Sequence, residues 1–369
     1  MTKHHMDMSL LKHTPGTRRM LSTLALALAL AGCGQPLATT PSAFRPTAAP
    51  SLAPAPAARP TAQPSATSAP TPTPEPSPTP RPDPANDPIF VGAGDIAACG
   101  SNGAEATARL LDRTEGTVFT LGDNAYESGS AEQFRDCYEP TWGRHKARTY
   151  PAPGNHDYAT PGADGYYDYF GERAGPDRRG YYSFELAAWH IVSLNSEIAA
   201  GPDSEQAQWL QADLAAHPAT CTLAFWHRPI FSSGGVHGND PHMRAIWEIL
   251  ARAGADVVLS GHDHLYERFA PQTSDGLADP HGMREFVVGT GGASLYGWGQ
   301  IRPNSEVRYN EGYGVLKLTL HAASYDWEFV PDGAGGFSDS GSAACVGAGP
   351  TAALNGFREQ IERIGAITR

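Results

Sequence analysis

Residues 117–126 read Thr-Val-Phe-Thr-Leu-Gly-Asp-Asn-Ala-Tyr. The first five are β-branched, aromatic or aliphatic, a composition that predicts a short buried strand. Gly122 then permits a tight turn, and Asp123 follows it directly. Ligands of α/β proteins bind at the carboxyl ends of the sheet strands. This segment therefore predicts a strand that delivers a carboxylate to a binding site.

Strand and helix patterns alternate on both sides of this segment. Strands are predicted at residues 89–91, 220–226 and 256–259, and helices at residues 104–111, 204–215 and 242–253. The alternation predicts an α/β core. Three later strand-like segments follow one another without long helices between them, and they suggest additions to a second sheet: residues 284–288, 314–320 and 324–330.

Polar side chains follow the predicted strands in five places. The five loops are Gly94-Asp95, Gly122-Asp123-Asn124-Ala125-Tyr126, Pro153-Gly154-Asn155-His156-Asp157, Trp226-His227 and Gly261-His262-Asp263-His264. A single Gly-Asp is an ordinary turn, and a single histidine is usually a surface or core residue. Five loops that each carry a hard or borderline metal ligand, at the same edge of a sheet, predict one metal site.

These loops together resemble the five-block signature of the calcineurin-like metallophosphoesterases. A tyrosine three residues after Asp123 marks the purple acid phosphatase branch, and residues 261–268 resemble the last block of that branch. The resemblance covers roughly residues 89–330 and implies a four-layer α/β/β/α sandwich with two mixed β-sheets. The chain departs from the usual pattern at Ala97, Asp157 and Ala224. None of these departures removes a ligand.

The resemblance also implies a ligand set for two metal ions. Seven residues would act as ligands: Asp95, Tyr126 and His264 to one metal, Asn155, His227 and His262 to the other, and Asp123 to both. The implied pair is Fe(III) with Zn(II), Fe(II) or Mn(II). Carboxylate and phenolate oxygens suit a hard trivalent ion, and imidazoles suit a borderline divalent one. In the alternative, Tyr126 is a packing residue and the site holds two divalent ions.

Such a site predicts the hydrolysis of phosphate monoesters by a metal-bound water or hydroxide, as in an acid phosphatase. Two metals can hold both the attacking and the leaving oxygen of an in-line displacement. A phosphodiesterase or nucleotidase on the same site is the first alternative, because the loops around the metals decide the substrate. A non-catalytic surface-binding protein is the second, and it would be expected to lack ligands that are present here.

Two histidines are candidates for the proton donor to the leaving group. His156 lies beside the predicted ligand Asn155, and His237 follows the predicted ligand His227 by ten residues, with Asp240 as a possible partner. His237 can also be an exposed loop residue. Arg228 and Arg268 suit either phosphate binding or structural ion pairs. Three further histidines have no motif support: His190, His217 and His281.

The net charge of −12 is unevenly distributed. The first 88 residues contain seven Lys and Arg and four Asp and Glu, so the remaining residues carry a net charge of −15. An acidic domain binds nucleic acid poorly, because phosphate backbones require a basic surface. We therefore expect no specific nucleic-acid partner, and a small phosphorylated substrate that is recruited by bound cations. The oligomeric state is not predicted.

The N-terminal region predicts export. Arg18-Arg19 precede an apolar stretch from about Leu21 to Ala31, which is too short to span a membrane and fits a signal peptide. Residues 30–33, Leu-Ala-Gly-Cys, resemble a bacterial lipobox, which implies removal of residues 1–32 and a lipid on Cys33. The protein would then be an extracytoplasmic, membrane-anchored lipoprotein at the cell surface or in the periplasm. The alternative is an ordinary signal peptide followed by a chance cysteine, and Arg18-Arg19 leaves twin-arginine export open.

The remaining organisation follows from composition. Residues 33–88 hold 17 of the 32 prolines and are rich in Ala, Thr and Ser, which predicts an extended, disordered linker. The metallophosphoesterase domain is predicted at residues 89–345. In the tail, residues 346–369, the spacing of four apolar side chains predicts one helical face: Leu354, Phe357, Ile361 and Ile364.

The cysteine count predicts two disulfides. Of the five cysteines, Cys33 is assigned to the lipid, which leaves an even number in an exported domain. Three connectivities are possible, and we favour Cys99–Cys137 with Cys221–Cys345. Thiolate zinc ligation is the alternative, but the CxxC spacing typical of such sites is absent from the sequence.

Overall fold

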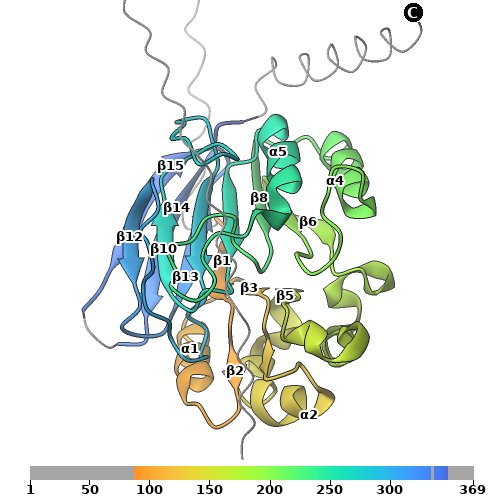
Figure 1. Cartoon of the computed structure of the whole chain (residues 1–369), viewed down its shortest axis with the longest axis vertical. Helices are drawn as coiled ribbons and strands as arrows, with labels where there is room; N and C mark the ends of the chain where they lie inside the picture. The colour runs from red at the N-terminus through yellow and green to blue at the C-terminus, as the bar shows by residue number, and fades with distance from the viewer. Residues whose placement is uncertain (1–86, 334–335, 348–369) are drawn as a thin grey trace, which may run out of the picture. The chain divides into compact units, whose positions relative to one another are not determined.

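Two mixed β-sheets form the centre of the structure, a computed structural model that describes residues 87–333 and 336–347. The predicted signal peptide, Cys33, the Pro-rich linker and the predicted helical face of the tail lie outside the described residues. Figure 1 shows the described part in colour, with many of the sheet strands at the left and centre and helices to the right of them and below.

The first sheet has six strands in the order β15-β14-β13-β1-β3-β5. Its strands, in chain order, are β1 (Ile89–Ala93), β3 (Thr117–Leu121), β5 (Thr149–Ala152), β13 (Gly314–Leu320), β14 (Ser324–Pro331) and β15 (Asp339–Ala344). β1, β3 and β5 are parallel, whereas β13 to β15 are antiparallel to their neighbours. The three late strands therefore extend the sheet as an antiparallel meander. Of the three late strand segments predicted as additions to a second sheet, 314–320 and 324–330 join this sheet with β1, whereas 284–288 joins the seven-stranded sheet.

The second sheet has seven strands in the order β12-β10-β11-β9-β8-β7-β6. Its strands are β6 (Tyr182–Leu186), β7 (Trp189–Ser193), β8 (Cys221–Phe225), β9 (Val257–Ser260), β10 (Tyr266–Phe269), β11 (Arg284–Val288) and β12 (Ser305–Tyr309). β7, β8, β9 and β11 are parallel, and the outer strands are antiparallel. A two-stranded parallel ribbon joins β2 (Ala97–Ala98) to β4 (Ala125–Tyr126).

Helices flank the two sheets (Figure 1). The α-helices are α1 (Gly103–Leu111), α2 (Ala131–Gln133), α3 (Asp164–Phe170), α4 (Glu205–Ala216) and α5 (Arg244–Ala253). A π-helical turn, η2 (Phe134–Tyr138), continues α2. The short 3₁₀ helices are η3 (Trp142–Arg148), η4 (Asp157–Ala159), η5 (Pro161–Ala163), η6 (Gly171–Ala174), η7 (Pro176–Arg178) and η8 (Pro241–Met243).

Apolar side chains fill the space between the sheets and beneath the helices. Phe90 of the first sheet faces Phe225 of the second, with ring centroids 5.8 Å apart. On the outer face of the second sheet, Val192 and Val258 belong to a separate cluster with residues of α4 and α5 such as Leu210. α1 packs against β13 of the first sheet. The predicted four-layer α/β/β/α sandwich with two mixed sheets is confirmed.

The register of the parallel strands brings their carboxyl ends to one edge. Leu121 pairs with Ala152 at the ends of β3 and β5, and Phe225 pairs with Leu259 near the ends of β8 and β9. In each case a predicted polar loop begins within three residues of the strand end. The loops of both sheets therefore emerge at the edge where α/β proteins bind ligands.

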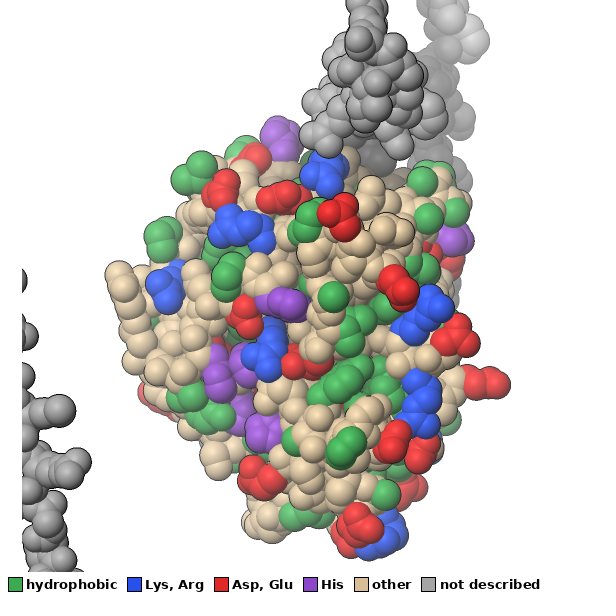
Figure 2. Space-filling view, turned by 45° about the vertical axis from the view of Figure 1, so that its right-hand side comes forward, with side chains coloured by type: hydrophobic (Ala, Val, Ile, Leu, Met, Phe, Trp, Pro, Cys, Tyr) green, Lys and Arg blue, Asp and Glu red, His purple; other side chains and the backbone are tan. Residues whose placement is uncertain are grey.

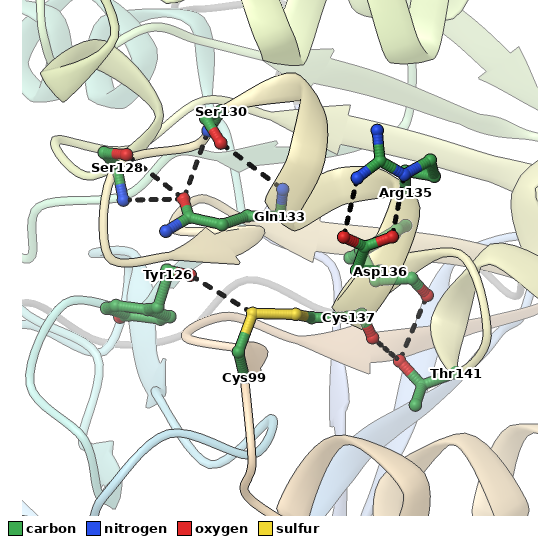
Figure 3. The surroundings of a disulfide bond; sticks show 10 residues. Cys99, Tyr126, Ser128, Ser130, Gln133, Arg135, Asp136, Cys137 and Thr141 are labelled. Carbon is green, nitrogen blue, oxygen red and sulfur yellow. Dashed lines mark hydrogen bonds and ion pairs between the residues drawn. A yellow bond between two sulfur atoms is a disulfide. The ribbon is translucent and has the colours of Figure 1, made fainter. Parts of the chain in front are cut away.

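Both predicted disulfides are confirmed. Cys221, the first residue of β8, is bonded to Cys345, which directly follows β15, so this bond links the two sheets. Cys99 is bonded to Cys137 in the π-helical turn, and its Sγ lies 3.8 Å from the backbone oxygen of Tyr126 (Figure 3). The Cys99–Cys137 disulfide thus supports the loop that carries Tyr126. No helix among the described residues is long and apolar enough to cross a membrane.

Candidate metal centre

Tyr126 stands at the centre of one group of predicted ligands. Its hydroxyl oxygen lies 2.9 Å from Oδ1 of Asp95, 3.1 Å from Oδ2 of Asp123 and 3.0 Å from Nε2 of His264. Nε2 of His264 is also 3.3 Å from Oδ1 of Asp95. These atoms come from loops after β1, β3 and β9, so the fold brings together side chains from both sheets.

His227 stands at the centre of the second group. Its Nε2 lies 3.0 Å from Oδ1 of Asn155, 3.0 Å from Nδ1 of His262 and 3.3 Å from Oδ2 of Asp123. Oδ2 of Asp123 therefore contacts both groups. All seven predicted ligand side chains lie in one connected cluster, with Asp123 between its two halves.

Backbone groups orient the imidazole rings. Nδ1 of His227 donates to the carbonyl oxygen of Leu121 at 2.7 Å, and Nδ1 of His264 donates to that of Ser294 at 2.6 Å. Because a carbonyl only accepts, both rings carry their proton on Nδ1 and present Nε2 to the cluster. His262 is oriented the other way and presents Nδ1 to His227.

Backbone N–H groups orient the two carboxylates in the same manner. The N–H of His262 donates to Oδ2 of Asp95, and the N–H of His156 donates to Oδ1 of Asp123, both at 2.8 Å. In each carboxylate the other oxygen is left for the cluster. Asp95, Asp123 and His262 also have positive φ values of 62°, 52° and 68°. Backbone strain of this kind in non-glycine residues concentrates at functional sites.

Burial makes the charges of the cluster costly unless they are balanced. Asp95, Asp123 and His227 are almost completely buried. Burial alone would lower the pKa of His227, but the Asp123 carboxylate raises it to about 10. Burial and the neighbouring Asp123 and Asp95 carboxylates raise the pKa of Tyr126 well above its usual value. A proton on His227 thus balances part of the charge of the two carboxylates, the neutral Tyr126 hydroxyl hydrogen-bonds to both, and metal binding would displace such protons.

The donor set fits two metal ions. It combines two carboxylates, one phenol oxygen and one amide oxygen with three imidazole nitrogens, which suits a hard ion next to a borderline one. Asp123, His227 and His262 by themselves offer atoms that all lie within 4.8 Å of one another.

Residues 89–266 match the family model described as calcineurin-like phosphoesterase. This part of the chain is thus similar to the calcineurin-like phosphoesterases. Among curated proteins, purple acid phosphatase 21 of Arabidopsis thaliana is 37% identical over 158 residues, which are 40% of this chain and 36% of the relative. Purple acid phosphatase 15 of the same plant is 27% identical over 227 residues, 52% of this chain and 42% of the relative. The chain thus spans about two fifths of the length of these relatives.

Solved structures show the same fold. A purple acid phosphatase from yellow lupin (Lupinus luteus) seeds superposes with a TM-score of 0.56 at 20% identity, covering 72% of this chain and 55% of the other. GAP50, the anchor in the inner membrane complex of Plasmodium, superposes with a TM-score of 0.53 at 16% identity, covering 70% and 89%. These two likenesses concern the fold alone.

His156 lies at the edge of the cluster. Its Nδ1 donates to the carbonyl oxygen of Glu127 at 2.6 Å, and its Nε2 is 3.9 Å from Oδ2 of Asp123. The side chain is 31% exposed. His156 is therefore within reach of both the cluster and the solvent. Figure 2 shows histidine side chains gathered on one face of the domain.

His237 also lies beside the cluster. Its ring stacks on His262 with centroids 3.9 Å apart, and the residue is exposed. The predicted partner Asp240 is directed elsewhere: its Oδ1 accepts the N–H of His242 at the start of η8, and its Oδ2 is 3.7 Å from Nη1 of Arg228. The carboxylate that contacts the backbone of His237 is Asp263, at 3.2 Å. The turn that starts η8 thus places Asp240 beside Arg228.

The two arginines considered for phosphate binding both form ion pairs. Arg228 pairs with the buried Glu197 through Nε and Nη2, each at 2.9 Å. Arg268 pairs with Asp339, with Nε at 2.8 Å from Oδ2, and with Glu306. Both arginines therefore form the structural ion pairs that were the alternative to phosphate binding.

Some residues beside the cluster were not identified from the sequence. Tyr296 stacks on His264 with ring centroids 3.9 Å apart and an interplanar angle of 10°. Three buried carboxylates hold the segment between His227 and Gly238: Glu285 accepts the N–H of Phe231, Glu267 that of Ser233, and Asp263 that of Gly238. Asp263 and Glu267 belong to the last block of the signature, but their contacts with this segment were not predicted. Nothing in the sequence marked Tyr296 or Glu285.

The backbone of Gly154 lies close to Asp123. A larger residue at position 154 therefore tests the packing around this carboxylate. A Cβ at Gly154 would lie 2.2 Å from Oδ1 of Asp123 and 2.4 Å from its backbone nitrogen. We expect Gly154→Ala to displace Asp123 and to lower the free energy of unfolding by about 1–3 kcal/mol, as overpacking does. Chemical denaturation measures this loss.

Gly201→Ala is the matched control, because a Cβ there would meet nothing within 4 Å. Equal stability of the two variants would contradict the packing around Asp123.

Proposed function

We propose that the phosphoesterase domain hydrolyses phosphate monoesters at a centre that holds two metal ions. The observation that carries the proposal is the convergence of seven donor side chains in one cluster, in which Oδ2 of Asp123 contacts both halves. The family match and the purple acid phosphatase relatives support the same class of reaction. The relatives are matched over only part of their length, so the activity is inferred for this domain by itself.

The two halves of the cluster suggest the division of ligands. We assign Asp95, Tyr126 and His264 to one ion and Asn155, His227 and His262 to the other, with Asp123 as a ligand of both. The half with a phenol and a carboxylate suits Fe(III), and the half with two imidazoles suits Zn(II), Fe(II) or Mn(II). The bound ions would supply Lewis acidity to the phosphoryl oxygens and lower the pKa of an attacking water.

The protein's own groups supply orientation and a proton. The carbonyl oxygen of Glu127 holds the Nδ1 proton of His156, so Nε2 is the nitrogen that faces Asp123. When Nε2 carries a proton, it can donate that proton to the leaving alkoxide. His237 is the second candidate for this role, from the other side of the cluster. The net negative charge of the domain repels a phosphate ester, so the cations must provide the attraction.

Replacement of the shared carboxylate tests the proposal. We expect Asp123→Asn to lose both metal ions and activity together, because each ion loses a charged ligand. The measurements are metal analysis with an absorption spectrum and assays on an aryl phosphate monoester and diester. A tyrosinate bound to Fe(III) would add a visible absorption band.

Asp203→Asn is the control for Asp123→Asn, since Asp203 is exposed and distant in sequence from every assigned ligand. A folded wild-type domain that binds no metal and hydrolyses neither ester would overturn the proposal. Faster hydrolysis of the diester than of the monoester would replace the monoesterase assignment.

The proton donor is tested separately. We expect His156→Ala to retain both metals and to slow turnover of an alkyl phosphate by about 10²–10⁴-fold, with a smaller effect on an aryl phosphate that leaves without a proton. Steady-state rates on the two substrates measure the difference. The same selective loss in His237→Ala, with His156→Ala unaffected, would transfer the role to His237.

We also propose that the chain is exported and anchored through a lipid on Cys33, with residues 1–32 as signal peptide and residues 33–88 as a spacer. Residues 89–345 would form the catalytic domain and residues 346–369 a tail. The basic and apolar leader and the Leu-Ala-Gly-Cys sequence support this arrangement. In a bacterial host, Cys33→Ala should move the protein from the membrane fraction to the soluble fraction. A variant that stays in the membrane fraction would refute the lipid anchor.

A further inference from the structure

A second cluster of metal-ligating side chains lies between α4 and the edge of the seven-stranded sheet. His190 is the second residue of β7, Asp213 lies in the last turn of α4, and His217 directly follows that helix. Each of the three offers one ligand atom, and these atoms all lie within 4.8 Å of one another. Sequence motifs gave no reason to connect these residues, because 23 positions separate His190 from Asp213.

The contacts of His190 resemble those of a metal-binding histidine. Its Nδ1 is 2.8 Å from Oε1 of Glu185, and its Nε2 is 2.7 Å from Oδ2 of Asp213. Glu185 stands directly opposite His190 in the antiparallel pair of β6 and β7. Metal-ligating histidines commonly donate their second N–H to a carboxylate, which fixes the tautomer that presents the other nitrogen to the metal. Glu185 is in position to do this for His190.

Asp213 is oriented by a similar outer partner. The hydroxyl of Ser183 donates to Oδ1 of Asp213 at 2.7 Å, and Oδ2 then faces His190. Nδ1 of His217 donates to the backbone oxygen of Asp213 at 2.9 Å, which leaves Nε2 of His217 as the nitrogen that can act as a ligand. The side chains of His190 and Asp213 are 1% and 7% exposed, while that of His217 is 49% exposed. The site thus has two buried ligands, and the third is open to the solvent.

We propose that His190, Asp213 and His217 bind a divalent cation of the zinc type. Two imidazoles and one carboxylate are a usual ligand set for Zn²⁺, with water in the fourth position. Ligand atoms bound to a tetrahedral zinc ion lie about 3.3 Å apart, given bond lengths near 2.0 Å. Nε2 of His190 and Oδ2 of Asp213 are 2.7 Å apart and need to move apart by a fraction of an ångström to reach this value.

This site is separate from the candidate metal centre. His190 pairs with Thr222 near the start of β8, whereas the candidate centre follows the other end of that strand, after Phe225. None of the seven assigned ligands belongs to the second cluster. A cation there would connect α4 to β7 and stabilise the outer layer of the domain. The proposal therefore does not depend on the phosphoesterase activity.

Zinc binding to the full-length protein tests the proposal. The protein is loaded with its catalytic metals and dialysed against micromolar Zn²⁺, and bound zinc is measured per chain. We expect His217→Ala to bind one zinc ion fewer than the wild type and to keep the same activity. Because His217 is exposed, its replacement should leave the fold intact. Circular dichroism of the variant checks this. We expect Glu185→Gln to weaken zinc binding by about 10–100-fold, the usual effect of losing the carboxylate that orients a metal-binding histidine.

His281→Ala is the matched control, because His281 is exposed and its backbone rather than its ring makes the local hydrogen bond. It should bind as much zinc as the wild type. Equal zinc content in the wild type and in His217→Ala would overturn the proposal, as would an equal loss in His281→Ala. Unchanged zinc affinity in Glu185→Gln would reject the role given to Glu185.

Discussion

The buried carboxylates of Asp95 and Asp123 are the constraint on which the rest of the site depends. They lie at the ends of neighbouring parallel strands, where a charge without a partner would be very costly. The surrounding structure supplies the partners: the Tyr126 hydroxyl, the imidazoles of His227 and His264, and two backbone N–H groups. Positive φ values at both aspartates show that the backbone accepts strain to hold this arrangement.

The same principle organises the segment that carries His237. Asp263, Glu267 and Glu285 are all buried, and each accepts backbone N–H groups of residues 230–238. Burial raises the pKa of Glu285 to about 8, against the effect of these hydrogen bonds. The buried acids of the second sheet thus fix the course of a loop beside the cluster. Part of the acidity of the domain thus serves its structure.

Much of the fold was predictable because strands and their loops are short, local patterns. Apolar runs that lead into Gly-Asp or Gly-His identified β1, β3 and β9, and an apolar run before Trp226-His227 identified β8. The disulfide pairing was predicted correctly among three possibilities. The partner of Arg228, the stacking of Tyr296 on His264 and the direction of Asp240 were not predicted. Each depends on contacts between segments whose separation in the sequence has no fixed period.

The sequence by itself determined which donor types stand at the strand ends, because side-chain chemistry and strand periodicity are local properties. Tertiary structure alone decided which atoms meet. It turned Nδ1 of His262 and Nε2 of His227 toward each other, and it placed one oxygen of Asp123 between the two groups. It also brought His190, Asp213 and His217 together from a strand and a helix with no shared motif. Such contacts arise only when the helices and sheets pack, since packing sets the orientation of every buried ring and carboxylate.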